Sequence, residues 1–287
     1  MLLAVAALPG RVEAATVDHG LRPQSADEAD GVGRLCATMG IRHQILTVEW
    51  DEKPSGNMQA IARDVRYNLL CEWARGRNLE AVATAHHVDD QAETLLMRLN
   101  RGAGVGGLAG VHPSRPLGTA VGGETMIMLI RPLLTWRRVD LAAIVAAAGL
   151  TAIDDPSNAD DRFDRTRARA LLAESAWLDP ARLAAVAKHC SDAKRALEWA
   201  SWQEFSARQS TEGDILVLNA EGLPFELQRR LLVDAIKLLT GNFPAGPETV
   251  RALDALSEGR TVTLAGLKLE PGPPWRLSWT QPHRRDC

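Results

Sequence analysis

Short apolar runs rich in β-forming residues, each leading into a polar turn and then a helical pattern, constrain the fold of this chain most. The runs are EAATV at Glu13–Val17, RHQILTVEW at Arg42–Trp50, EAVATA at Glu80–Ala85 and MIMLI at Met126–Ile130. Strands that alternate with helices favour parallel pairing, with the helices on the faces of the sheet. We therefore predict an α/β fold on a mostly parallel sheet.

Three helices are expected around these strands. SADE at Ser25–Glu28 matches a capping box, so a helix should start there and end near Gly40. Apolar positions at helical spacing predict a second helix from Asn57 to Gly76 and a third over Arg138–Leu150.

The character of the chain changes after Asp154–Asn158. A charge-dense stretch is followed by a long helical pattern that ends near Arg208. We place a boundary at 178–180, which predicts a catalytic domain over 1–178 and a smaller, mostly helical domain over 179–287. The second domain should combine helices over 225–239 and 247–256 with short strands over 260–266 and 275–279.

Composition narrows the class of protein. The four cysteines, Cys36, Cys71, Cys190 and Cys287, form no C-x-x-C pair and no Cys/His metal spacing, which fits a reducing cytoplasm. The opening apolar run lacks the basic region of a signal peptide, and no later segment is apolar for long enough to span a bilayer. A net charge of -3 favours neither a nucleic acid nor a membrane partner, although most of the 33 basic residues are arginine, which suits phosphate.

The segment Ala83–Gly110 carries the densest chemistry. A metal site of His86, His87, Asp89 and Asp90 is disfavoured, because adjacent side chains at a strand end point to opposite sides. The glycines at 102, 104 and 107 spell G-x-G-x-x-G, but they follow a helix instead of opening one, so a dinucleotide loop is also disfavoured.

A third interpretation rests on the helix that should begin at Asp90, after the strand ending near His87. That order places the first helical turn at the carboxyl edge of a parallel sheet, where α/β folds bind ligands. Asp90 and Glu93 fall within roughly an 80° arc with Met97 and Arg101, and should face a ligand crevice. The buried stripe would be Ala92, Leu95, Leu96 and Leu99. A capping box formed by Asp90 and Glu93 explains the same pair, and both interpretations stay open.

Six blocks, in order along the chain, resemble the tRNA(Ile)-lysidine synthase family. They are VDHGLRPQSADEA, NMQAIARDVRY, TAHHVDDQAET, RGAGVGGLAG, IRPLL, and DDPSNAD followed by RTRAR. The resemblance is close from about Ala15 to Leu172. It implies an ATP pyrophosphatase domain of the PP-loop superfamily, with an adenine-nucleotide alpha-hydrolase-like, Rossmann-like sheet. It also implies a two-step reaction, in which ATP adenylates carbon 2 of the wobble cytidine of a CAU-anticodon tRNA(Ile) and L-lysine then displaces AMP.

The resemblance implies roles for particular residues. Asp90 and Glu93 match the acidic pair of the family, which serves Mg²⁺, the reacting base or the incoming lysine, and Arg66 matches an arginine of its catalytic centre. Asp18 and His19 match a strand end near the nucleotide, although local turn chemistry would explain them as well. The expected cofactors are ATP and Mg²⁺.

Other residues are expected to meet the tRNA. The glycine-rich loop, including Gly102 and Gly104, matches a loop beside the substrate, with a helix stop as the alternative. The arginines expected at tRNA phosphates are Arg101, Arg131, Arg162, Arg165, Arg167 and Arg169. A solvated charged helix face is the competing interpretation, and Thr166 departs from the asparagine usual in the family.

One family feature does not occur in the sequence. The S-G-G-x-D-S phosphate loop follows the first strand of the family, whereas Met1–Leu8 resembles the helix after that loop. The resemblance thus implies an upstream strand between Ala14–Val17 and Ala81–Ala85, so we expect a gap or a direct pairing between those two, and weak ATP binding and stability for the chain as it stands. An ATP-incompetent RNA-binding paralogue and a tRNA thiolation enzyme are the competing functions. Oligomeric state, including a homodimer, stays open.

Overall fold

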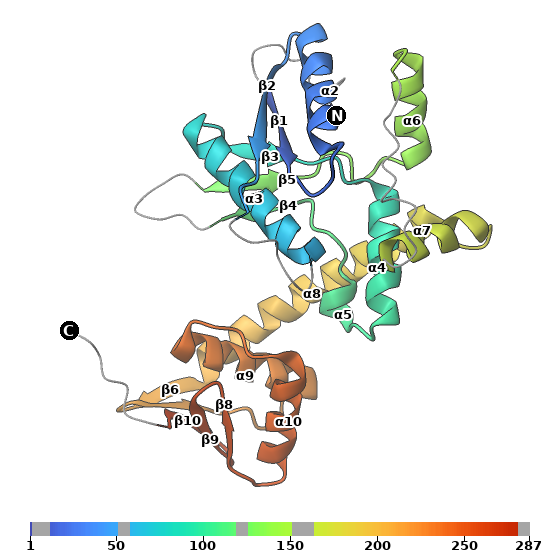
Figure 1. Ribbon diagram of the computed structural model, residues 1–287. Coiled ribbons are helices and arrows are strands. Elements are labelled where there is room, and N and C mark those ends of the chain that lie inside the picture. Colours follow the sequence, from blue (N-terminus) through green and yellow to red (C-terminus); the bar gives the residue numbers. More distant parts are fainter. Residues whose placement is uncertain (2–11, 51–57, 119–125, 151–163, 281–287) are drawn as a thin grey trace. The chain divides into compact units, whose positions relative to one another are not determined.

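The computed structural model describes residues 1, 12–50, 58–118, 126–150 and 164–280 of the 287-residue chain. The chain folds into two compact units, Met1–Ser191 and Asp192–Cys287 (Figure 1). The boundary between these units lies inside one long helix, α8 at Pro180–Arg208. The division of roles between 1–178 and 179–287 remains a prediction.

The first unit begins with two parallel strands that are connected by one helix. β1 at Glu13–Asp18 pairs with β2 at Arg42–Thr47 from end to end, and α2 at Ser25–Thr38 connects them. Both strands and the helix confirm the alternation in the sequence. α2 begins at Ser25 as predicted, but the capping box is not formed: Gln24 is the N-cap, and the Ser25 hydroxyl donates to the Arg22 carbonyl oxygen at 2.9 Å.

A second sheet has the order β3-β5-β4. β3 at Ala81–Ala83 runs parallel to β5 at Ile127–Ile130, while β4 at Ser114–Leu117 is antiparallel and lies at the edge. The sequence did not predict β4, whose run SRPL contains a proline. An edge position tolerates that proline, because its missing N–H faces away from the ladder.

Helix α3 at Met58–Gly76 links the two sheets. It contacts β1, β3, β4 and β5, and Tyr67, Leu70 and Cys71 on its buried face join a core that includes Val82 and Leu129. In the described residues no ladder of hydrogen bonds joins β1 to β3, so the gap expected between these strands is observed. Within these ranges, packing against α3 and the ion pair of Glu13 with Arg77 connect the two sheets.

Four more helices of the first unit follow β3 along the chain. They are α4 at Val88–Asn100, α5 at Val105–Leu108, α6 at Arg138–Ala147 and α7 at Asp164–Glu174. Of these, α5 and α7 pack on α4. α4 begins two residues before the predicted start. Ala92 and Leu95 are buried as expected, but Leu99 is 57% exposed because the last turn of α4 extends beyond the core.

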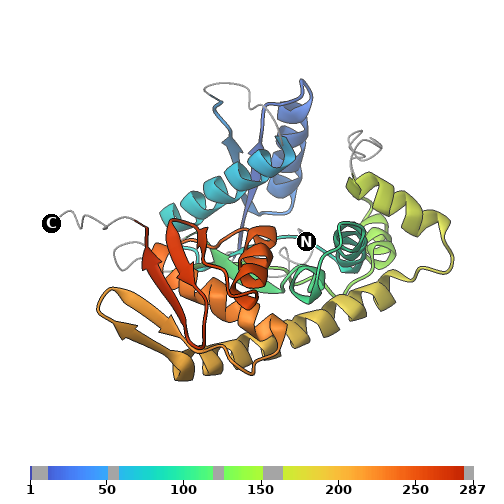
Figure 2. The same cartoon turned by 90° about the horizontal axis from the view of Figure 1, so that it is seen from below.

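The second unit combines the end of α8 with two helices and an antiparallel sheet (Figure 2). The sheet order is β6-β7-β10-β9-β8, and α9 and α10 share its apolar core, which includes Leu216, Leu231, Leu253 and Leu277. The elements are β6 Gln209–Glu212, β7 Ile215–Leu218, α9 Phe225–Thr240, α10 Gly246–Ser257, β8 Val262–Leu264, β9 Leu267–Glu270 and β10 Trp275–Trp279. Helical residues outnumber strand residues, as expected, but the five-stranded sheet was not predicted.

Candidate active site at the carboxyl edge of the strands

The first turn of α4 follows directly from β3. His87 is its N-cap in an extended conformation, and its backbone N–H donates to Oδ2 of Asp90 at 2.9 Å. The reciprocal capping pair is thus His87 with Asp90, not Asp90 with Glu93 as the sequence suggested. Asp90 fixes the end of the helix, and its second oxygen, Oδ1, lies 3.6 Å from Arg165.

Glu93 lies one turn further along α4 and is 2% exposed, so it does not face an open crevice as expected. Its two oxygens each accept a hydrogen bond from α7, Oε2 from Arg165 Nε and Oε1 from Arg169 Nε, both at 2.9 Å. A buried carboxylate needs such partners, because an unpaired charge away from water costs on the order of several kcal/mol. Glu93 is thus a carboxylate held between two arginines, and its catalytic role stays a prediction.

Asp164, at the start of α7, holds two of the other arginines expected at tRNA. Arg101 and Arg167 both donate to its carboxylate. Hydrogen bonds from Arg101 and then Arg167 lower the pKa of Asp164. Arg162 lies outside the described residues. In this structure Arg101, Arg165, Arg167 and Arg169 therefore all contact carboxylates, and their binding to tRNA stays a prediction.

His86 marks the point where side chains from several elements meet. Burial lowers its pKa from 6.5 to about 4; Asp90 opposes this shift, and the charges of Arg131, Arg63 and Arg165 add to it. Its Nδ1 is 2.9 Å from the hydroxyl oxygen of Thr84. His86 is consequently neutral at pH 7 and can exchange hydrogen bonds without carrying charge. Neither this role of His86 nor the presence of Arg63 beside it is predicted by the sequence pattern.

Asp18 and His19 lie at the carboxyl end of β1. Asp18 is 8% exposed, and the neighbouring Ser25 side chain, followed by the hydrogen bond from the Gly20 backbone N–H, lowers its pKa. Burial and then the charge of Arg66 lower the pKa of His19, which brings Arg66 into the same electrostatic neighbourhood. The predicted turn chemistry is therefore present, and contact with a nucleotide stays a prediction.

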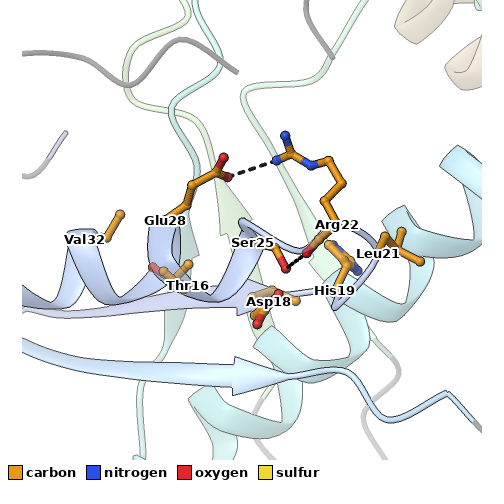
Figure 3. Close-up of a pocket in the computed structure, with 10 residues that line it drawn as sticks. Thr16, Asp18, His19, Leu21, Arg22, Ser25, Glu28 and Val32 are labelled. Atoms are coloured by element: carbon orange, nitrogen blue, oxygen red, sulfur yellow. Dashed lines mark hydrogen bonds and ion pairs between the residues drawn. The ribbon is translucent and has the colours of Figure 1, made fainter. Parts of the chain in front are cut away.

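A pocket of about 380 Å³ opens beside this strand end (Figure 3). Val17, Asp18 and His19 line it from β1 and the residues after it, and Ala29 and Val32 line it from α2. On its wall an ion pair joins Arg22 to Glu28 at 2.9 Å. Apolar walls with a few polar groups at the carboxyl edge of parallel strands suit a heterocyclic base.

The glycine-rich loop is attached firmly to α4. Gly102 has φ of +69° and ends that helix, as the alternative interpretation predicted, and Gly104 is the N-cap of α5. Arg98 donates to the carbonyl oxygens of Gly107 and Gly110 at 2.7 and 3.0 Å. These contacts fix the path of the loop, and its place beside a substrate stays a prediction.

The donor set at Asp90 and Glu93 does not fit Mg²⁺ in this arrangement. Both oxygens of Glu93 accept from arginines, and Oδ2 of Asp90 accepts from a backbone N–H. Over the described ranges, no group of three or more His, Cys, Asp or Glu residues could hold a metal ion. A hard divalent cation prefers several free oxygen ligands, so no role for the metal is derived from this pair.

Comparison with known proteins agrees with the fold. Residues 2–176 match the PP-loop domain family, which covers more than half of the chain. The protein is thus a PP-loop protein, with parallel strands whose carboxyl edge carries the candidate site. None of the described helices is long and apolar enough to cross a membrane.

Curated relatives narrow the class further. The chain is 42% identical over 275 residues to the tRNA(Ile)-lysidine synthase of Zymomonas mobilis, covering 96% of this chain and 82% of that protein. It is 44% identical over 292 residues to the tRNA(Ile)-lysidine synthase of Novosphingobium aromaticivorans, covering 100% of this chain and 86% of that protein. The chain belongs to the tRNA(Ile)-lysidine synthase family. A solved U34-tRNA thiolase from Methanococcus maripaludis is 17% identical with a TM-score of 0.46, over 64% of this chain and 61% of that one, and contributes nothing to this assignment.

Proposed function

We propose that this protein joins L-lysine to carbon 2 of the wobble cytidine in a CAU-anticodon tRNA(Ile), at the expense of ATP. The observation that supports this most is the identity of 42% and 44% to two lysidine synthases over nearly the whole chain. The position of Asp90 supports it as well, because this residue lies in the first turn of α4 directly after β3, with its Oδ1 3.6 Å from Arg165. Work on tRNA would place the protein in the cytoplasm.

In the first step, the carbon 2 oxygen of cytosine attacks the α-phosphorus of ATP and the bond to pyrophosphate breaks. Cationic side chains fixed in advance stabilise the negative charge that develops on the phosphoryl oxygens. Arg66 is the residue we assign to this task, since it contacts no carboxylate in the described part of the chain. The pocket beside Asp18 and His19 would hold the adenine.

In the second step, the ε-amine of lysine attacks carbon 2, and the carbon–oxygen bond to AMP breaks. The amine must lose a proton, which a nearby carboxylate can accept. We assign this to Asp90, whose Oδ1 lies 3.6 Å from Arg165 and is the less engaged oxygen of the acidic pair. Glu93 would keep Arg165 and Arg169 in place, and Mg²⁺ would travel with the phosphates of ATP.

Mass spectrometry of the wobble nucleoside tests this function. The chain is incubated with ATP, isotope-labelled lysine and tRNA(Ile) of CAU anticodon, and a matched tRNA with a wobble uridine serves as the control. Labelled lysidine should form only on the wobble cytidine and only with ATP. Absence of label, although the protein is folded and binds the tRNA, would refute the proposal.

A thiolation function is not favoured by the cysteines. Cys36 and Cys71 are buried on α2 and α3, and Cys71 Sγ donates to the carbonyl oxygen of Leu117 at 3.1 Å. Sulfur transfer would need accessible, paired thiols. Replacing lysine by a sulfur donor in the same assay should therefore leave the tRNA unchanged.

A further inference from the structure

Three arginines surround the ring of Tyr67 on α3. The Cζ atoms of Arg63 and Arg115 each lie 5.0 Å from the ring centroid, and that of Arg66 lies at 5.9 Å. Tyr67 itself is 6% exposed, so its ring is a fixed platform inside the protein. An aromatic face attracts a guanidinium group and restricts where it can lie.

A fourth arginine joins this cluster from the end of β5. Arg131 is 4% exposed, and its Nη1 donates to the carbonyl oxygen of His112 at 2.6 Å. Its Nε is buried and has no hydrogen-bond partner among the described residues. Burial lowers the pKa of Arg131, a hydrogen bond with Tyr67 opposes that shift, and the charges of Arg115 and Arg63 add to it.

The four arginines differ from those of α7 in their partners. Within the described ranges, no carboxylate pairs with Arg63, Arg66, Arg115 or Arg131, whereas Glu93 and Asp164 together hold four other arginines. Like charges collected around one ring repel one another, and an anion bound between them would relieve that repulsion. A negatively charged ligand therefore suits the arrangement of these arginines.

The cluster lies where a substrate would arrive. Arg131 follows β5 at the carboxyl edge of the sheet, and Arg115 is paired with Leu129 at the start of the antiparallel β4. Arg63 and Arg131 both act on His86, the residue at the centre of the candidate active site. Several guanidinium groups suit a phosphate, whose oxygens accept the planar N–H fork, better than a carboxylate with its single charge.

We propose that Arg63, Arg115 and Arg131, arranged around Tyr67, bind a phosphate group of the substrate, with Arg66 at the margin toward His19. The source of the phosphate is either the RNA backbone beside the wobble nucleotide or the polyphosphate of ATP; the RNA source rests on the function proposed above. Tyr67 acts as a positioning residue, because it touches the arginines and not the ligand.

Binding measurements on the full chain test the site. The variants are Arg63→Gln, Arg115→Gln and their combination, and Arg251→Gln on the exposed side of α10 is the matched control. The probes are a fluorescent anticodon stem-loop RNA with a CAU loop, and separately inorganic tripolyphosphate and ATP. Each single variant should weaken one phosphate probe by about tenfold, since a charged hydrogen bond contributes on that scale, and the control should bind like wild type.

The salt dependence identifies the source. If RNA is the ligand, the slope of log K against log salt should fall by about 0.7 to 0.9 for each lost contact, and the tripolyphosphate affinity should not change. If ATP is the ligand, the affinity for tripolyphosphate and ATP falls and the RNA slope stays. Both results support the site.

Unchanged affinity for all three probes in the folded double variant would overturn the proposal, as would a wild-type protein that binds none of them. Tyr67→Phe, which keeps the ring but loses the hydrogen bond with Arg131, should retain more of the binding than Tyr67→Leu. An arginine-dependent RNA affinity without any lysine transfer would instead refute the proposed function and leave the phosphate site supported.

Discussion

Arg165 Nε lies 2.9 Å from Oε2 of Glu93, and the side chain of this glutamate is only 3% exposed. The two residues are 72 positions apart in the chain. Arg169 contacts the other oxygen of the same carboxylate. The acidic residue of α4 is thus the anchor through which α7 is fixed at the candidate active site.

Glu93→Gln should destabilise the protein and abolish lysine transfer. The amide keeps the shape but leaves Arg165 and Arg169 without a counter-charge. Losing one partner of a fully buried pair costs 3–5 kcal/mol, and because these arginines are partly exposed to water we expect about 2 kcal/mol. Urea unfolding and the labelled-lysine assay measure the two effects. Glu174→Gln, at an exposed site on α7, the helix of Arg165 and Arg169, should change neither.

Two substitutions at Asp90 separate capping from chemistry. Asparagine can still accept the hydrogen bond from the His87 N–H, so Asp90→Asn should alter the free energy of unfolding by less than about 0.5 kcal/mol while lysine transfer is lost. Asp90→Ala removes the cap as well and should cost about 1 kcal/mol. Near wild-type turnover in the asparagine variant would leave only the capping role for this residue.

Stability should decline as the pH falls from about 6.5 toward 4. The unfolded chain protonates His86 near its ordinary pKa of 6.5, whereas the folded protein holds that pKa at about 4, so the unfolded state binds more protons in this window. Urea titrations at pH 7, 6 and 5 measure the slope, which His86→Gln should reduce without abolishing it, because burial also lowers the pKa of His19 and of His43. Asp18 does not interfere, because the stabilisation from its lowered pKa is lost only below its ordinary value of 3.8. Equal slopes in both proteins would contradict the assignment.

Gly110 should be the least replaceable glycine of the loop after α4. Its φ is +65°, and an added Cβ would lie 2.4 Å from Oε1 of Gln91 and 3.0 Å from the Cβ of Ala187. Gly213 has a similar φ of +60° with nothing within 4 Å. Gly213→Ala should therefore cost about 1 kcal/mol for the backbone conformation alone, and Gly110→Ala about 3 kcal/mol through the added clash. Thermal unfolding compares the two, and similar losses would show that the loop gives way at no cost.

The local residue pattern predicted those strands and helices that depend on the residues of a single segment. The apolar runs gave β1, β2 and β5, and helical spacing gave α2, α3 and α6 with ends within a few residues. β4 and β6 have little β-forming character of their own. SRPL and QSTE become strands because a neighbouring strand offers a ladder, which is a non-local fact.

At the candidate site, too, the local sequence predicted some features, while others depend on residues far apart in the chain. Order along the chain placed Asp90 at the start of a helix after a strand, which the structure confirms within two residues. The partners of Glu93 lie 72 and 76 residues away, and no periodicity within α4 could reveal that they bury it. The arginine cluster at Tyr67 likewise joins residues from α3, β4 and the end of β5, so it emerges only when the sheet forms.

The absence of a ladder between β1 and β3 in the described residues bears on how this unit opens. A continuous sheet loses its hydrogen bonds cooperatively. Among the described residues, side-chain packing and the ion pair of Glu13 with Arg77 join the β1–β2 pair to the rest of the unit, and no backbone ladder does. The β1–β2 pair with α2 can therefore separate from the rest at a free energy below that of global unfolding. Amide hydrogens of Ala14–Val17 would then exchange with solvent as one group and earlier than those of Val82 and Leu129, and the strand end that lines the pocket would be the part of the site that moves most readily.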